Sequence, residues 1–134
     1  MNLLLNIDVP DLAAAEAFYV AAFGLVPARR LGNDVLELIG AQVRIYLLRK
    51  PAGSVGATGS ARGYSRHWTP LHCDIVVDDL ESALARALSA GALQEAGIRE
   101  AAWGRIAQLA DPFGHGWCLV EFSETGYDAV ANPS

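Results

Sequence analysis

Residues 72–91, HCDIVVDDLESALARALSAG, contain the pattern that decides the fold. Over residues 72–77 the side chains alternate, with hydrophobic residues on one parity and His72 and Asp74 on the other. This period of two predicts a half-buried strand with one apolar face and one face that carries chemistry.

The second part of the same stretch has the features of an amphipathic helix. We expect Asp78 to cap its first turn, with Glu81 three residues later as in a capping box. Gly91 is a typical residue at which a helix ends. The hydrophobic residues recur at helical spacing and predict a buried face; they are Leu80, Ala83, Leu84, Ala87 and Leu88.

The same plan occurs 68 residues earlier, from Leu4 to Ala15. Five aligned pairs are identical: Ile7 and Ile75, Val9 and Val77, Asp11 and Asp79, Leu12 and Leu80, and Ala15 and Ala83. A repeat that occurs once in each half of the chain indicates duplication of a supersecondary unit. Two of the differences matter for chemistry: Leu4, which aligns with His72, and Asp8, which aligns with Val76.

Each half is predicted to follow the order β-α-β-β-β, which gives an α+β fold with eight strands and two helices. We expect one domain over residues 1–134, with modules at 3–49 and 69–122, a linker at 50–68 and a polar tail at 123–134, where Tyr127 holds the tail down. The expected strands are 3–9, 25–30, 35–39, 41–49, 72–77, 93–98, 104–110 and 117–122, and the first helix is expected at 11–23.

Residues 51–63, PAGSVGATGSARG, have the composition of a linker or a mobile loop. Loops of this kind are most often passive connections, and that interpretation is favoured. The aromatic and basic cluster that follows keeps a lid over a site open as an alternative; it comprises Tyr64, Arg66, His67 and Trp68.

The charge balance limits the partners of the chain. Ten basic and 15 acidic residues give a net charge of −5, and Lys50 is the only lysine, so nucleic acid and anionic membranes are not expected partners.

Residues 3–5 are apolar, but Asn6 and Asp8 soon interrupt them, so neither a signal peptide nor a spanning segment is expected. Two cysteines are too few for a disulfide framework, and the cytoplasm is the expected location.

Several motifs together carry a family resemblance. The helix exit Tyr19-x-x-x-Phe23-Gly24-Leu25, the repeated modules and the segment DPFGHGWCLVEF at 111–122 resemble the vicinal oxygen chelate superfamily. That superfamily includes glyoxalase I, extradiol dioxygenases, fosfomycin resistance proteins and bleomycin-binding proteins. The resemblance covers about residues 3–122 and implies that the modules form a cup-shaped mixed sheet.

In metal-using members, four positions in the cup supply His, Gln or Glu ligands, and by the resemblance these map to Leu4, Tyr46, His72 and Cys118. A leucine has no lone pair to offer, and a phenol and a thiol depart from the expected donors. We therefore expect no bound metal. The alternative is one divalent metal such as Zn, Ni, Mn or Fe, held irregularly by His72 with Asp8, Asp74, Cys118 or Glu121, of which Glu121 is the weakest candidate because it faces the other side of its strand.

The expected ligand-binding residues share a place in or near this cup. They are Leu4, Asn6, Tyr46, Trp68, His72, Asp74, Trp103, Arg105 and Cys118. Trp103 and Arg105 would stack on and pair with a flat anion, but the favoured interpretation is that Trp103 and Gly104 are simply the entry to the strand. Cys118 is expected to be a packed thiol rather than a nucleophile.

Three functions remain open from the sequence. The first is a small-molecule binding protein with a metal-free cup, which by the resemblance is a homodimer. The second is a metal-dependent lyase, isomerase or dioxygenase of the same superfamily. The third is a metal-free acid/base enzyme that uses His72 and Tyr46, unless His72 is only a hydrogen-bonded remnant of a lost site.

Overall fold

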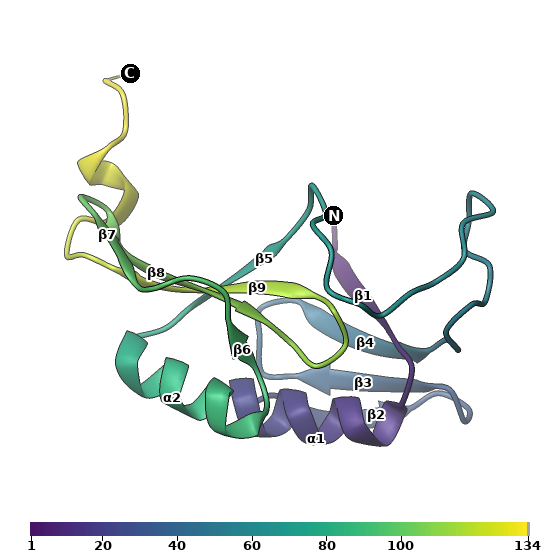
Figure 1. Ribbon diagram of the computed structural model, residues 1–134. Coiled ribbons are helices and arrows are strands. Elements are labelled where there is room, and N and C mark those ends of the chain that lie inside the picture. The colour runs from purple at the N-terminus through teal and green to yellow at the C-terminus, as the bar shows by residue number, and fades with distance from the viewer. Residues whose placement is uncertain (134) are drawn as a thin grey trace. The chain divides into compact units, whose positions relative to one another are not determined.

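The computed structural model of the protein describes residues 1–133 and divides the chain into two compact units. The first unit is Met1–Ser65, and the second begins at Arg66. The boundary lies inside the segment 50–68 that the sequence predicts to be a linker. Each unit contains one sheet and its own helix (Figure 1).

The first unit has the predicted order β-α-β-β-β. Its elements are β1 (Leu4–Val9), α1 (Leu12–Phe23), β2 (Val26–Arg30), β3 (Val35–Ile39) and β4 (Arg44–Arg49). The strands lie in the order β1-β4-β3-β2, with β1 parallel to β4 and the other pairs antiparallel. One face of the sheet packs on α1 and supplies the core, with Ile7, Val9, Leu36, Leu38 and Leu47 almost fully buried.

The second unit repeats this topology. Its elements are β5 (Cys73–Val76), α2 (Leu80–Ala90), β6 (Leu93–Gln94), β7 (Arg99–Ala101), β8 (Gly104–Ala110), β9 (Gly116–Phe122) and a short 3-10 helix, η1 (Gly126–Ala129). The strands lie in the order β5-β9-β8-β6, and β7 also pairs with β8. As in the first unit, the first strand is parallel to the last, so the α+β class and the tandem arrangement agree with the prediction.

The predicted strand at 93–98 is too long, because β6 ends at Gln94, and a further short strand that was not predicted, β7, follows at Arg99–Ala101. The chain bends at Ala96, whose carbonyl accepts a hydrogen bond from the Gln94 side-chain amide at 2.9 Å. The described chain therefore has nine strands instead of eight.

The helix caps confirm one prediction and correct another. The Asp11 side chain accepts a hydrogen bond from the Ala14 N–H at 3.0 Å, as an N-cap does. In the second unit the cap is Asp79, which accepts from the Ser82 N–H at 3.0 Å, and not Asp78. Asp79 is the residue that the repeat aligns with Asp11, so the alignment was a better guide than the local capping-box pattern.

The tail and the loop are both held by specific contacts. The Tyr127 ring of η1 lies 4.7 Å from that of Phe122 and 5.9 Å from that of Trp103, which confirms that Tyr127 holds the tail down. In the first unit, Arg62 donates to Asp8 at 2.8 Å and Tyr64 donates to the Lys50 carbonyl at 2.6 Å. These bonds are typical of an ordered connection, and closure of the 51–63 loop over a site stays a prediction.

Within residues 1–133, neither helix has the length and apolar character that a membrane crossing requires.

Candidate functional site

A row of three polar side chains crosses the sheet of the second unit. Asp74 on β5 is in register with Cys118 on β9, and Cys118 is in register with Gln108 on β8. The alternate residues Trp117 and Leu119 are buried among core side chains on the side of α2. Because successive side chains of a strand point to opposite faces, the three polar groups share the face that α2 does not cover.

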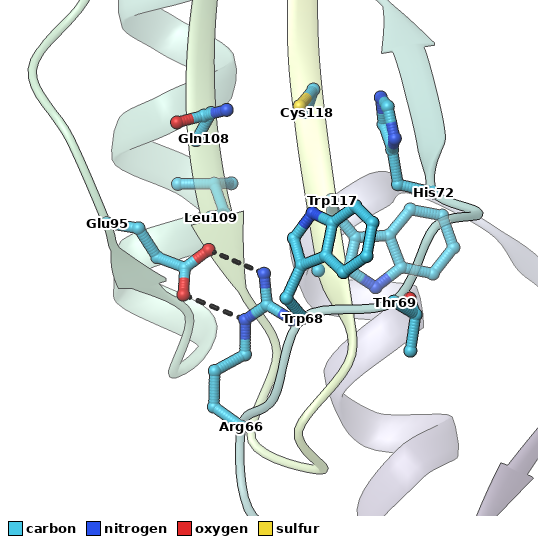
Figure 2. Close-up of a pocket in the computed structure, with 10 residues that line it drawn as sticks. Arg66, Trp68, Thr69, His72, Glu95, Gln108, Leu109, Trp117 and Cys118 are labelled. Atoms are coloured by element: carbon cyan, nitrogen blue, oxygen red, sulfur yellow. Dashed lines mark hydrogen bonds and ion pairs between the residues drawn. The ribbon is translucent and has the colours of Figure 1, made fainter.

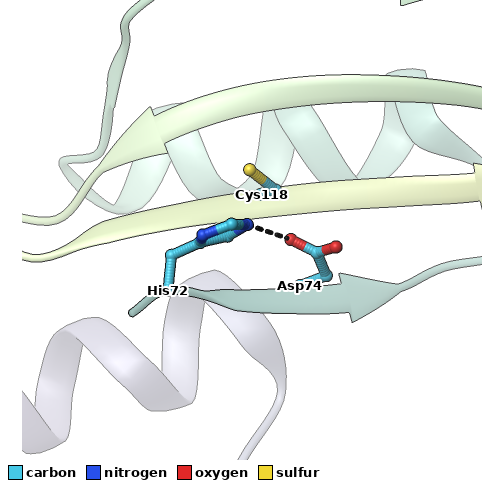
Figure 3. A group of neighbouring side chains, drawn as sticks. All are labelled: His72, Asp74 and Cys118. Carbon is cyan, nitrogen blue, oxygen red and sulfur yellow. Dashed lines mark ion pairs between the residues drawn. The ribbon is translucent and has the colours of Figure 1, made fainter. Parts of the chain in front are cut away.

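His72 adds an imidazole to this row. It lies just before β5, and its Nε2 is 3.3 Å from Asp74 Oδ1 (Figure 3). The His72 side chain is 59% exposed, so solvent and ligands can reach it. The donor atoms of His72, Asp74 and Cys118 all lie within 4.8 Å of one another, and these three residues are named the His-Asp-Cys cluster below.

The Cys118 thiol is kept protonated by its surroundings. Cys118 is only 6% exposed, and burial, followed by the negative charge and hydrogen bond of Asp74, raises its pKa to about 11. A thiol with this pKa is almost entirely uncharged at neutral pH and is a poor nucleophile. This agrees with the expectation of a packed thiol rather than a nucleophile.

A pocket of about 280 Å³ opens beside the cluster, entirely within the second unit (Figure 2). One side is formed by the irregular segment 66–72, in which the Trp68 side chain lies open to solvent at 79% exposure. The lining combines an indole, an imidazole, an amide and a thiol with an ion pair. The residues are Arg66, Trp68, Thr69, His72, Glu95, Gln108, Leu109, Gly116, Trp117 and Cys118.

An ion pair anchors the segment that carries Trp68. Arg66 donates to Glu95 through Nε at 2.8 Å and Nη2 at 2.9 Å. The guanidinium lowers the pKa of the Glu95 carboxyl, so the pair is charged at neutral pH. Arg66 also lies directly over Gly116, where a Cβ atom would come within 2.5 Å of Nη2, so a larger residue at this position would require the Arg66 side chain to move.

The turn between β8 and β9 sets the register on which the row depends. Asp111 is buried and accepts from the Phe113 N–H at 2.8 Å, the His115 N–H at 3.0 Å and the Trp117 indole at 3.0 Å. The Asp-Pro-Phe-Gly segment therefore has a structural role, and His115 takes part through its backbone.

The structure brings part of the predicted site together. Trp68, His72 and Cys118 line the pocket, and Asp74 lies beside them. Arg105 lies on the α2 side of the sheet, in register with Glu121, and pairs there with Glu121 at 2.9 Å and with Glu81 at 2.8 Å, so its part in ligand binding stays a prediction. The Trp103 ring packs against Tyr127 and does not line this pocket, so its part in ligand binding also stays a prediction.

The residues predicted in the first half lie on one face of the first sheet. Leu4, Asn6 and Tyr46 share the parity that α1 does not cover, and the Tyr46 hydroxyl donates to Glu37 at 2.7 Å. Because this bond occupies the hydroxyl hydrogen, the acid/base hypothesis for Tyr46 loses support. Glu37, which sequence reasoning missed, is the buried centre of this network.

The four positions that the resemblance implies do not make a metal site, because Leu4 has no donor atom and the phenol of Tyr46 is bonded to Glu37. Asp8 is paired with Arg62, and Glu121 is bonded to Arg105 and to the Leu80 N–H. The His-Asp-Cys cluster differs, since imidazole, carboxylate and thiolate are all zinc ligands and three of them leave an open position. By donor type and proximity the cluster fits a soft divalent ion.

A second acidic group, formed by Asp79, Glu81 and Glu121, is already used by the fold. Asp79 caps α2, and the carboxylates of Glu81 and Glu121 share the Arg105 guanidinium.

Some pocket residues were within reach of sequence reasoning and others were not. The Asp-Pro-Phe-Gly turn fixes an antiparallel register in which Gln108 faces Cys118, so the hairpin could have identified Gln108. Arg66 and Glu95 lie far apart in sequence, and neither segment contains a motif that pairs them. Their contact forms only in the folded chain, where Glu95, directly after β6, lies next to Arg66.

Comparisons with known proteins define the class. The family model of the Glyoxalase-like domain matches residues 5–120, and the chain belongs to this family. An uncharacterised protein of Mycobacterium bovis is 34% identical over 119 residues, which cover 85% of this chain and 78% of that protein. The anthracycline biosynthesis protein DnrV of Streptomyces peucetius is 33% identical over 90% of this chain, but the match covers only 40% of DnrV.

Solved structures share the fold at low identity. The fosfomycin resistance protein FosX of Listeria monocytogenes has a TM-score of 0.71 at 16% identity, over 92% of this chain and 94% of FosX. The lactoylglutathione lyase of Agrobacterium tumefaciens has a TM-score of 0.64 at 20% identity, over 90% and 92% of the two chains. These matches establish the glyoxalase/bleomycin resistance/dioxygenase fold, and the function has to be argued from the site.

Proposed function

We propose that the protein binds a small, planar organic molecule in the pocket of the second unit and needs no metal to do so. The observation that carries the proposal is the exposed indole of Trp68 in a pocket that hydrogen-bonding side chains, among them His72 and Gln108, also line. An aromatic surface next to a few polar anchors is what ligand pockets provide, and about 280 Å³ is close to the lower end of their size range.

The lining suggests how such a molecule is held. A flat ring can stack on Trp68, while the Gln108 amide can both donate and accept hydrogen bonds. The Cys118 thiol is uncharged at neutral pH, and the Arg66 and Glu95 charges neutralise each other. The pocket therefore favours a neutral or weakly polar ring over a strongly charged one.

The names of two relatives suggest one kind of planar ligand. Two matched proteins, DauV and DnrV, are named for anthracycline biosynthesis, and anthracyclines are planar fused-ring compounds. The chain spans about two fifths of each of these proteins, so the likeness supports a class of ligand rather than a reaction.

Equilibrium dialysis of the full chain against an anthracycline, after treatment with EDTA, tests the proposal. We expect saturable binding that Trp68→Leu weakens about tenfold, the loss expected for one stacked aromatic pair. Leu71→Ala is the matched control, because Leu71 is exposed in the same segment and does not line the pocket. No binding by the EDTA-treated protein, or equal losses in both variants, would overturn the proposal.

The His-Asp-Cys cluster favours a second candidate, a metal-dependent enzyme of the same superfamily. In that case His72, Asp74 and Cys118 would hold the ion, and the ion would supply Lewis-acid chemistry to a molecule in the pocket. Cobalt(II) distinguishes the candidates, since a thiolate ligand gives a sulfur-to-metal absorption band. The metal-dependent function predicts this band in the Cys73→Ser control and its loss in Cys118→Ser, whereas the metal-free function predicts no band in either.

We also propose that the protein is a homodimer, as the family resemblance implies, and that it acts in the cytoplasm, as expected for a chain with only two cysteines. Light scattering after size exclusion tests the assembly, and a mass of twice 14.2 kDa is the expected result. A single-chain mass at all concentrations would refute the dimer.

A further inference from the structure

A buried carboxylate organises the open face of the first sheet. Glu37 on β3 is 1% exposed although its side chain points to the face that α1 does not cover. It accepts four hydrogen bonds: from Arg29 Nε at 2.9 Å, Arg29 Nη2 at 2.7 Å, Arg44 Nη1 at 3.2 Å and the Tyr46 hydroxyl at 2.7 Å. A carboxylate with this many donors has no acceptor capacity left to offer a ligand.

The two arginines keep most of their own capacity. Their side chains are 63% and 57% exposed, and each guanidinium has five N–H donors. Arg29 uses two of them on Glu37 and Arg44 uses one, so the remaining donors face solvent. With two positive charges and one negative charge, the group carries a net charge of +1 in a protein whose net charge is −5.

We propose that Arg29 and Arg44, held by Glu37, form a binding site for an oxyanion, namely a carboxylate or phosphate group of a small molecule. The polar groups that remain free are the N–H donors of positively charged guanidinium groups, and these do not bind a cation. Planar guanidinium groups match the geometry of carboxylates and phosphates. This site uses no residue of the pocket in the second unit and stands independently of the function proposed above.

The role of Glu37 in this site is to fix its shape. A free arginine loses rotamer entropy when it binds a ligand, whereas Arg29 is already held by two hydrogen bonds. Tyr46 lies on the neighbouring strand in register with Glu37, and its hydroxyl also bonds to the Glu37 carboxylate and limits the movement of this group. The site is therefore preorganised before the anion arrives.

Arg30 provides a matched control on the same strand. It follows Arg29 directly, is also exposed, and also pairs with one carboxylate, Glu16 at 2.7 Å. It lies on the opposite face, because it is in register with the core residue Leu36. A nonspecific effect of charge or ionic strength should act on Arg30 as strongly as on Arg29.

Two-dimensional NMR of arginine Nε–H groups in the full chain tests the proposal. Sodium phosphate and sodium acetate are titrated separately against sodium chloride at constant ionic strength. We expect saturable shifts of the Arg29 and Arg44 signals with at least one of the two anions, and a stationary Arg30 signal. A response to phosphate alone assigns a phosphate group, and a response to acetate assigns a carboxylate.

Variants give the second readout. Arg29→Gln and Arg44→Gln should each reduce the affinity at least tenfold, and Arg30→Gln should leave it within twofold. Arg44→Gln removes a single hydrogen bond of 3.2 Å and so should remain folded even if Arg29→Gln does not. Shifts that stay linear with concentration, or that are equal at Arg30, would overturn the oxyanion site.

Discussion

Asp74 makes contact with both of its functional neighbours and so controls the chemistry of the cluster. It lies 3.3 Å from His72 Nε2 and is in register with Cys118, whose thiolate form its charge disfavours. One carboxylate thereby pairs with the imidazole and adds to the effect of burial, which is the largest cause of the raised pKa of the thiol. The sequence could place these residues on one side of the β5 and β9 strands, but their separation depends on the parallel pairing.

Removal of the Asp74 charge should make Cys118 easier to ionise. In a Cys73→Ser background, Asp74→Asn should lower the pKa of Cys118 from about 11. The pKa should stay above the ordinary value of 9.0, because burial is the largest cause of its shift. The rate of alkylation between pH 8 and pH 11 measures this, and an unchanged or slower reaction in Asp74→Asn would contradict it.

Glu37 should make the folded state sensitive to acid. Its arginine and tyrosine partners hold the pKa of its carboxyl far below the ordinary 4.5, so the folded state binds fewer protons than the unfolded one. The stability that the charged Glu37 contributes is present above pH 4.5 and is lost progressively as the pH falls below that value.

Urea unfolding between pH 7 and pH 2 checks this dependence. Glu37→Gln should be less stable than the natural protein at pH 7, and the difference should shrink as the pH falls. A difference between the two proteins that stays constant over this range would show that the Glu37 charge contributes nothing.

At the scale of elements, the repeat was the most reliable part of the sequence argument. It aligned Asp11 with Asp79 and predicted a strand and helix in each half, because period and capping are local properties. The local pattern around Asp78 and Glu81 was misleading, since Glu81 pairs with Arg105 instead of closing a capping box. The hydrophobic pattern of residues 93–98 reveals neither the early end of β6 at Gln94 nor the separate strand β7 at Arg99–Ala101.

Substitution of the two adjacent aspartates separates the true cap from its neighbour. Asp79→Ala should reduce the free energy of unfolding by about 1 kcal/mol, because it removes the bond to the Ser82 N–H. Asp78→Ala should stay within about 0.5 kcal/mol of the natural protein, as surface changes usually do. Chemical denaturation measures both, and a larger loss in Asp78→Ala would restore the original assignment.

Gly104 should be intolerant of any side chain. It begins β8 with φ +145°, and a Cβ atom there would clash with the Glu121 carbonyl oxygen on β9. We expect Gly104→Ala to cost more than about 2 kcal/mol through strain and disrupted pairing. Gly97→Ala is the control, since its Cβ would meet nothing within 4 Å; equal stabilities of the two variants would refute the account.

At the scale of the whole molecule, the two units share a topology and differ in chemistry. His72 and Asp74 of the second unit correspond to Leu4 and Asn6 of the first, and the open face of the first sheet carries the Glu37 network instead. The fold was predictable because the duplication, the parity of each strand and the Asp-Pro-Phe-Gly turn can be recognised directly in the order of the residues. The pocket was predictable only in part: the β8–β9 hairpin places Gln108 opposite Cys118, but Arg66 and Glu95 meet only through long-range contacts.

The most direct test of the account is an NMR titration of the EDTA-treated full chain with an anthracycline. Binding in the proposed pocket predicts saturable shifts of the Trp68 indole N–H and the Gln108 side-chain amide, with the Trp103 indole signal unmoved. Shifts confined to Trp103, or shifts at Trp68 that require an added divalent metal, would contradict a metal-free binding pocket in the second unit.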